Sequence, residues 1–176
     1  IQYREKHMKS GEMLEECRLM RRLTREAGAC FIVDDHVDLA ILAEADGVHI
    51  GQEDFPLPAV RQLVGPKMCI GLSTHSPEQA RAAVAVGADY IGVGPSSPPR
   101  PRRTWWPRLG FDYLDWVAAN ISIPFVAIGG IKEHNINGCG PSRGPLLRPG
   151  LRTGWAPPTS AVQGAGRTAP PMQRGM

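Results

Sequence analysis

The feature that most constrains this fold is a regular alternation of short apolar segments with amphipathic ones, which continues from residue 1 to residue 130. The apolar segments are rich in β-branched residues, as buried strands are. Continuous apolar strands that alternate with helices are typical of a parallel sheet. We therefore predict an α/β protein with strands at residues 1–4, 31–33, 48–50, 68–72, 90–93 and 125–128.

The segments between these strands carry helix signals. Leu14, Cys17 and Met20 recur at helical spacing, and Gly28 follows as a stop. Ser76 followed by Pro77 is an N-cap with proline in the first turn. We predict further helices at residues 37–44, 57–63, 76–87 and 113–119.

An open doubly wound sheet and a closed (β/α)8 barrel both fit this alternation. The barrel is favoured because the repeat is uniform and because polar or glycine clusters follow almost every strand, where barrels carry their functional groups. A complete barrel has eight strands. We therefore expect an incomplete TIM barrel, in which the first strand (before Ile1) and the last strand (after Gly130) are missing and the chain is a fragment.

Two segments differ in composition from the rest of the chain. Residues 96–108 hold four Arg, and residues 137–176 hold five Arg, eight Gly and seven Pro, with no acid in either segment. Without these nine Arg, the rest of the chain has 11 of the 20 basic residues and all 17 acidic ones, so its formal net charge is −6. We predict one barrel domain at 1–136 with an aberrant loop at 96–108, then a disordered low-complexity tail at 137–176.

Composition also limits location and partners. No apolar run approaches the roughly 18 residues of a membrane span. The four cysteines show no metal-ligand or CxxC spacing, which favours reduced thiols in a cytoplasmic protein. The Arg-rich tail could bind nucleic acid, but apart from Trp155 it lacks interleaved aromatic residues. Small molecules are therefore the expected partners.

Basic side chains and glycines at strand ends predict a site for phosphorylated ligands. Gln2, Arg4 and Lys6 share one side of the first strand by the period of two. Two cations and an amide suit a phosphate or diphosphate, although a solvated strand end explains them equally well. Gly129 and Gly130, after the last strand, let backbone N–H groups approach an anion closely.

Acidic and hydroxyl side chains end the neighbouring strands. Asp34 and Asp35 follow the second strand, and Asp54 follows the third. Carboxylates that face a cationic cluster suggest a Mg²⁺ bridging to a diphosphate, with helix capping as the alternative for Asp35 or Asp54. Ser73 lies near the fourth strand end, where capping is again the alternative. His49, inside an apolar strand, is interpreted as a core histidine rather than a catalyst.

Six motifs occur in order: Gln-x-Arg-Glu-Lys, Asp-Asp, Gly-Val-His-Ile-Gly-Gln-Glu-Asp, Gly-Leu-Ser-Thr-His-Ser, Gly-Ala-Asp-Tyr-Ile-Gly-Val-Gly-Pro and Ala-Ile-Gly-Gly-Ile. In these motifs the chain resembles the thiamine-phosphate synthase family across residues 1–136, apart from 96–108. The resemblance implies a Mg²⁺-dependent transferase of thiamine biosynthesis on a (β/α)8 barrel. It would condense 4-amino-2-methyl-5-hydroxymethylpyrimidine diphosphate with a thiazole phosphate and release pyrophosphate.

The resemblance also implies roles for particular residues. Asp35 and Asp54 would hold Mg²⁺, and the thiazole phosphate would meet Gly129 and Gly130. Position 34, at the substrate, is Asp where the family usually has Asn, and this extra charge should weaken diphosphate binding. The pyrimidine diphosphate would be held by Gln2, Arg4, Lys6 and Ser73.

Two further departures from the family are larger. A Thr-x-Thr-Lys loop should stand where residues 96–103 stand, and the last strand with its phosphate-binding Ser is absent. One hypothesis covers both, because codons for 96–102 can read Val-Phe-Ala-Thr-Pro-Thr-Lys when shifted by one base. We therefore expect frameshifts, testable in the encoding DNA, and little turnover. The alternatives are a thiazole tautomerase-like paralogue without diphosphate chemistry and a non-enzymatic remnant with a nucleic-acid-binding tail.

Overall fold

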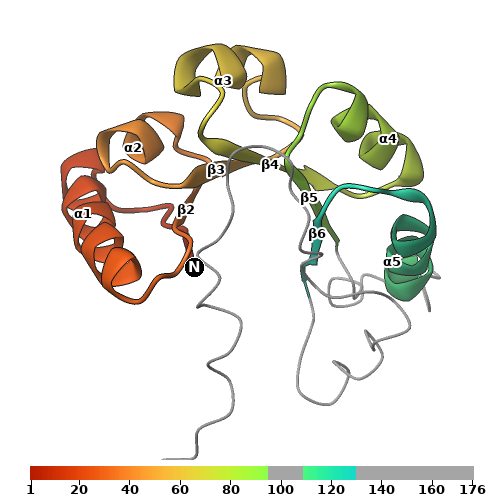
Figure 1. The fold of residues 1–176 in the computed structure, drawn as a ribbon, viewed down its shortest axis with the longest axis horizontal. Helices are drawn as coiled ribbons and strands as arrows, with labels where there is room; N and C mark the ends of the chain where they lie inside the picture. The colour runs from red at the N-terminus through yellow and green to blue at the C-terminus, as the bar shows by residue number, and fades with distance from the viewer. Residues whose placement is uncertain (95–108, 130–176) are drawn as a thin grey trace, which may run out of the picture.

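A computed structural model describes residues 1–94 and 109–129 of the chain, which contain six strands and five helices (Figure 1). Within these ranges strands and helices alternate, as the apolar pattern predicts. In chain order they are β1 (Gln2–Tyr3), α1 (Ser10–Glu26), β2 (Ile32–Asp34), α2 (Val37–Leu42), β3 (Gly47–Ile50), α3 (Leu57–Val64), β4 (Cys69–Thr74), α4 (Pro77–Ala85), β5 (Tyr90–Val93), α5 (Leu109–Asn120) and β6 (Phe125–Ala127).

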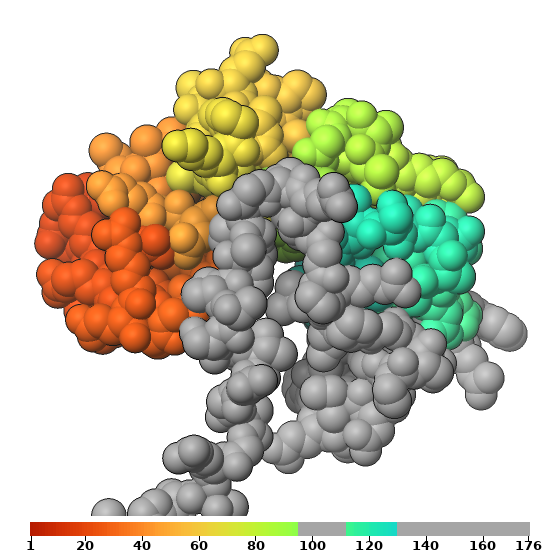
Figure 2. All heavy atoms as spheres, viewed as in Figure 1, coloured from red at the N-terminus to blue at the C-terminus, as the bar shows by residue number. Residues whose placement is uncertain are grey.

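The strands form one parallel sheet in the order β1-β2-β3-β4-β5-β6. The sheet is curved, and α1 to α5 lie on its outer, convex side (Figure 1). A space-filling view shows the same helices as the outer rim of the described part (Figure 2). A doubly wound sheet would reverse its strand order and carry helices on both faces. The described residues therefore form a partial (β/α)8 barrel, and the prediction of an incomplete barrel is confirmed.

The hydrophobic core lies between the sheet and the helices. Val33, Val48, Ile70 and Ile91 are completely buried and alternate along their strands with residues that face the concave side. Burying such a side chain contributes about 1.5–3 kcal/mol to folding. The period of two thus separates a packed outer face from an inner face that is available for a site.

Some element boundaries and faces differ from the sequence prediction. β4 continues to Thr74, two residues beyond the predicted strand end. Helix α1 buries Met13, Cys17 and Thr24, whereas Leu23 is 51% exposed. Ser76 caps α4 as predicted, since its Oγ accepts a hydrogen bond from the Gln79 N–H. None of the helices in the described ranges is long and apolar enough to cross a membrane.

Two aspartates tie the amino ends of neighbouring strands to the helical layer. Asp46 accepts hydrogen bonds from Arg21 of α1 at 2.7 Å and from the backbone N–H just before β2 at 2.8 Å. Asp89 repeats this arrangement with Arg61 of α3 at 2.5 Å and a backbone N–H of β4 at 2.7 Å. The amino-terminal face of a barrel usually serves stability, and these contacts fit that role.

Candidate functional site

The concave face of the sheet holds a cavity of about 630 Å³. All six strands contribute to its wall directly or through the residues beside them. The structure thus brings together, on one cavity, predicted site residues that lie up to 71 positions apart in the sequence. Those that line the cavity are Gln2, Arg4, Asp34, Asp35 and Ser73.

Asp34 contacts two polar side chains near the start of the chain, Gln2 of β1 and Arg4, which follows that strand. Its Oδ2 lies 2.7 Å from Arg4 Nε, and its Oδ1 accepts a hydrogen bond from Gln2 Nε2 at 2.8 Å. Asp34 is buried, and its pKa is raised above the ordinary value by that burial and by the nearby charge of Asp35. Asp34 therefore competes with any anionic ligand for Arg4 and Gln2.

Asp35 adopts a left-handed backbone conformation with φ of 64°. This conformation costs about 1–3 kcal/mol for a residue other than glycine, and such strain gathers at functional sites. The Asp35 N–H donates to the carbonyl of His49 at 2.8 Å. Within residues 1–94 and 109–129 the Asp35 carboxylate makes no hydrogen bond or ion pair, so it is available to a cation in the cavity.

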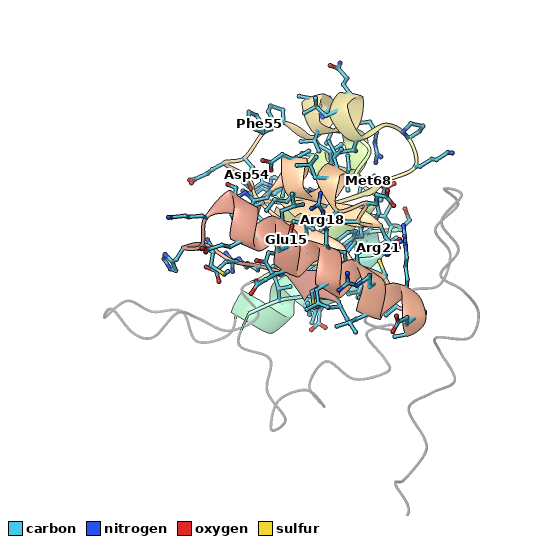
Figure 3. All side chains as sticks on the ribbon, turned by 90° about the vertical axis from the view of Figure 1, so that its left-hand side faces the viewer. Glu15, Arg18, Arg21, Asp54, Phe55 and Met68 are labelled. Atoms are coloured by element: carbon cyan, nitrogen blue, oxygen red, sulfur yellow. The ribbon has the colours of Figure 1, made fainter. Side chains whose placement is uncertain are left out.

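Asp54 lies beside this cavity rather than in its wall. Its Oδ2 accepts a hydrogen bond from the Gly51 N–H at 2.6 Å, and its charge acts on Asp34 and His49. Asp54 projects at the opposite end of the described part from Met68, which precedes β4 (Figure 3). It is therefore at the carboxyl ends of the strands, where barrel enzymes bind their ligands.

The alternative of helix capping is wrong for both of these aspartates. Helix α2 begins after His36 and helix α3 after Pro56, and neither has a side-chain cap. No group of three or more Asp, Glu, His or Cys side chains in the described ranges could enclose a metal ion. Mg²⁺ commonly uses one or two carboxylates and completes its shell with water and phosphate, so Asp35 and Asp54 stay a prediction for it.

The remaining predicted site residues are less closely placed. Lys6 is exposed and does not line the cavity, although its charge lowers the pKa of Asp34. Gly129 has a φ of 81°, a conformation that favours glycine, and lies just after β6. Gly130 lies outside the described residues, as do the loop at 96–108 and the tail at 137–176, so the predictions for them stand as predictions.

One connected group of side chains was missed by the sequence reasoning. His49 Nδ1 lies 2.9 Å from the Tyr90 hydroxyl, and His49 Nε2 lies 2.9 Å from Ser73 Oγ. His49 is buried, as predicted, and this burial lowers its pKa to about 4. Ser73 belongs to β4 and does not cap a helix, since Ser76 caps α4. His49 therefore connects Tyr90 to Ser73, which is predicted to bind the substrate.

Thr74 shows how the neighbouring hydroxyl differs from Ser73. It is completely buried, donates to the Gly92 carbonyl at 2.8 Å and accepts from the Tyr113 hydroxyl at 2.7 Å. Thr74 therefore fastens α5 to the sheet. Alternation along β4 directs one hydroxyl to the helices and the other to the cavity.

A partial parallel barrel with cationic, acidic and hydroxyl side chains at the carboxyl ends of its strands has the architecture on which (β/α)8-barrel proteins build their ligand sites. The family model described as thiamine monophosphate synthase matches residues 1–140. The chain is 57% identical over 136 residues to the thiamine-phosphate synthase of Lawsonia intracellularis. It is 60% identical over 136 residues to that of Pelotomaculum thermopropionicum. The chain belongs to the thiamine-phosphate synthase family.

A solved structure supports the same relationship. The fold is similar to that of a thiamine phosphate pyrophosphorylase from Pyrococcus furiosus, with a TM-score of 0.69 and 41% sequence identity over 77% of this chain and 64% of that one. The sequence matches cover 77% of this chain but only 63% and 62% of the two bacterial relatives. The chain thus spans less than two thirds of the length of these relatives.

Proposed function

We propose that the protein acts as a thiamine-phosphate synthase. This transferase joins 4-amino-2-methyl-5-hydroxymethylpyrimidine diphosphate to a thiazole phosphate and releases pyrophosphate. The observation that carries the proposal is the convergence of Arg4, Gln2, Ser73 and Asp35 on one cavity. The names of the relatives support the same activity.

In this proposal the diphosphate lies at the end of β1. The guanidinium of Arg4 would bind two phosphate oxygens with its planar fork, and Lys6 would add a point charge. Gln2 and the Ser73 hydroxyl would donate further hydrogen bonds. Because Arg4 and Gln2 contact Asp34, that carboxylate would compete with the phosphate oxygens for them.

The acidic residues fit a divalent cation. Asp34, Asp35 and Asp54 lie close enough for the other two charges to raise the pKa of Asp34. A Mg²⁺ held by Asp35 and Asp54 would relieve this repulsion. When bound, it would neutralise charge on the diphosphate leaving group. The protein itself would contribute mainly position and fixed charge, so the proposal needs no nucleophilic side chain.

The second substrate would approach from the end of β6. Gly129 and Gly130 would offer backbone N–H groups to the thiazole phosphate, since glycine permits the positive φ of 81° found at Gly129.

The cysteines in the described part of the chain are free thiols, which is consistent with a cytoplasmic location. They are Cys17, Cys30 and Cys69.

We also propose that this particular chain is impaired. Asp34 forms an ion pair with Arg4 that would compete with the diphosphate. In addition, residues 96–103 lack the Thr-x-Thr-Lys sequence expected between β5 and α5. Frameshifts would account for residues 96–108 and 137–176. Sequencing the encoding DNA tests this: a restored frame should read the family loop, and the restored chain should turn over faster than this one.

Calorimetric titration with inorganic pyrophosphate and Mg²⁺ tests the proposed site directly. Arg4→Ala should weaken binding at least about tenfold, because an ionic hydrogen bond contributes roughly 1.5–3 kcal/mol. Arg22→Ala, which removes an exposed Arg of α1, is the matched control and should bind like the parent chain. If the parent chain binds no pyrophosphate, the result would favour the thiazole tautomerase-like alternative, because a tautomerase needs no diphosphate site. Equal binding by both variants would contradict the role of Arg4.

A further inference from the structure

His49 stands between Tyr90 and Ser73 and contacts both with its ring nitrogens. The two contacts are each 2.9 Å, and the imidazole and phenol ring centroids are 5.3 Å apart. His49, Tyr90 and Ser73 all line the cavity. They come from three neighbouring strands, β3, β5 and β4.

The partners of His49 determine where its proton lies. His49 is buried, and within the described residues its ring contacts two hydroxyl groups and no carboxylate, so no contact there stabilises a second ring proton and the ring carries a single N–H. In the described part of the chain, the Tyr90 hydroxyl has no acceptor other than Nδ1. If Tyr90 donates to Nδ1, the ring proton is on Nε2 and is donated to Ser73 Oγ. The Ser73 hydroxyl hydrogen is then left for another acceptor.

The strands are built to make room for this pair. Gly71 lies opposite His49 on one side and opposite Tyr90 on the other. A Cβ atom at position 71 would lie 2.1 Å from Tyr90 Cζ and 2.4 Å from His49 Nδ1. A Cβ at Gly92 would lie 3.2 Å from His49 Cε1. Glycine at both positions therefore lets the two rings occupy the inner face.

The backbone of Ser73 is fixed as well. Gln52, in the segment after β3, donates from Nε2 to the Ser73 carbonyl at 2.6 Å. Ser73 is thus held by one hydrogen bond to its side chain and another to its main chain. Such double support limits the directions that the hydroxyl hydrogen can take.

We infer that Tyr90 and His49 are positioning residues that fix Ser73 as a hydrogen-bond donor to an anionic oxygen in the cavity. The identity of that anion as a diphosphate rests on the proposed function. The order of donation is Tyr90 to His49, His49 to Ser73, and Ser73 to the ligand. Tyr90→Phe would remove the first donor and free the His49 ring to place its proton on Nδ1.

The tautomer can be read by NMR without any ligand. A long-range ¹H–¹⁵N correlation spectrum of the uniformly labelled full chain, with His49 assigned through His49→Gln, should show the proton on Nε2 and an unprotonated Nδ1. Tyr90→Phe should shift His49 towards the Nδ1–H form. An Nδ1–H tautomer in the parent chain would overturn the inference, as would a spectrum unchanged by Tyr90→Phe.

A double-mutant cycle then tests the connection to Ser73. Tyr90→Phe and Ser73→Ala should each weaken Mg²⁺–pyrophosphate binding about three- to tenfold, the effect of one hydrogen bond. Tyr90→Phe should have no further effect in the Ser73→Ala background. Additive losses would overturn the inference, because the two residues would then act separately.

Tyr113→Phe is the matched control. Tyr113 is a buried tyrosine that donates to a β4 hydroxyl, but its partner Thr74 faces the helices. The variant should lower stability without changing the His49 tautomer or pyrophosphate affinity. A parent chain that binds no pyrophosphate would contradict the proposed function, and the tautomer spectrum would then decide the inference alone.

Discussion

The Nε atom of Arg4 lies 2.7 Å from Oδ2 of Asp34, at the place where an anionic ligand would need the guanidinium. Asp34 also accepts a hydrogen bond from Gln2. Its pKa is raised, mainly by burial and then by Asp35, so the contact with Arg4 does not compensate for the loss of water and the nearby charge. Arg4 and Gln2 are therefore held by an internal carboxylate that is itself unfavourably placed.

Replacing Asp34 with Asn should release Arg4 for ligand binding. The amide oxygen can still accept from Gln2, but it no longer holds the guanidinium by charge. Since the Arg4 side chain is 58% exposed, the ion pair is weak, and we expect pyrophosphate to bind on the order of three- to fivefold more tightly. Calorimetric titration measures this, with Glu12→Gln on α1 as the control for net charge. Unchanged or weaker binding would mean that Asp34 does not compete for Arg4.

His49 should make the fold sensitive to acid. Its pKa is about 4 in the folded state, against an ordinary value of 6.5. Between these values the unfolded chain binds a proton that the folded chain does not, so stability is lost as the pH falls. At pH 5 the loss relative to pH 7 should be about 2 kcal/mol. Urea unfolding at both pH values, without divalent cations, measures it.

Two variants separate this effect from other titrations. His49→Gln should remove most of the stability difference between pH 7 and pH 5. His7→Gln, at an exposed position, should leave the difference as it is in the parent chain. If His49→Gln kept the full pH dependence, another group would be responsible.

The aspartates at the amino ends of the strands should matter for stability alone. Asp89 is 9% exposed and contacts both Arg61 and a backbone N–H of β4, so Asp89→Asn should cost about 2–4 kcal/mol of unfolding free energy. The control is Glu44→Gln, because the Arg25–Glu44 pair is exposed and should contribute less than about 1 kcal/mol. Urea denaturation gives both values. A large effect of Asp89→Asn on pyrophosphate affinity would contradict the separation between the amino ends of the strands, which serve stability, and the carboxyl ends, which bind the ligand.

The strands and the barrel were predictable because each apolar run signals burial locally. The contacts of His49 were not, because they depend on register. His49 and Tyr90 are 41 positions apart and meet only because Gly71 lies between them in the sheet. Burial of His49 could be predicted from its apolar neighbours. Its bond to Ser73 could not.

The end of β4 gives a second example. Ending the strand at residue 72 left Ser73 and Thr74 as equivalent candidates for capping, but the strand continues to Thr74. Once both are in the strand, the period of two places them on opposite faces. The Asp-Asp motif predicted Asp35 as a site residue, but the positive φ of Asp35 could be found only from the structure.

The cysteines on the cavity wall should be chemically inert. Burial raises the pKa of Cys30 to about 11 and that of Cys69 to about 12. Since the thiolate is the reactive form, alkylation by iodoacetamide at pH 8 should be at least about 100-fold slower in the folded chain than in urea. Peptide mass spectrometry reads each cysteine separately, so Cys139, which lies outside the described residues, does not interfere. Rapid labelling of Cys30 in the folded chain would show that its thiol is ionised and exposed, contrary to the raised pKa that its burial gives it.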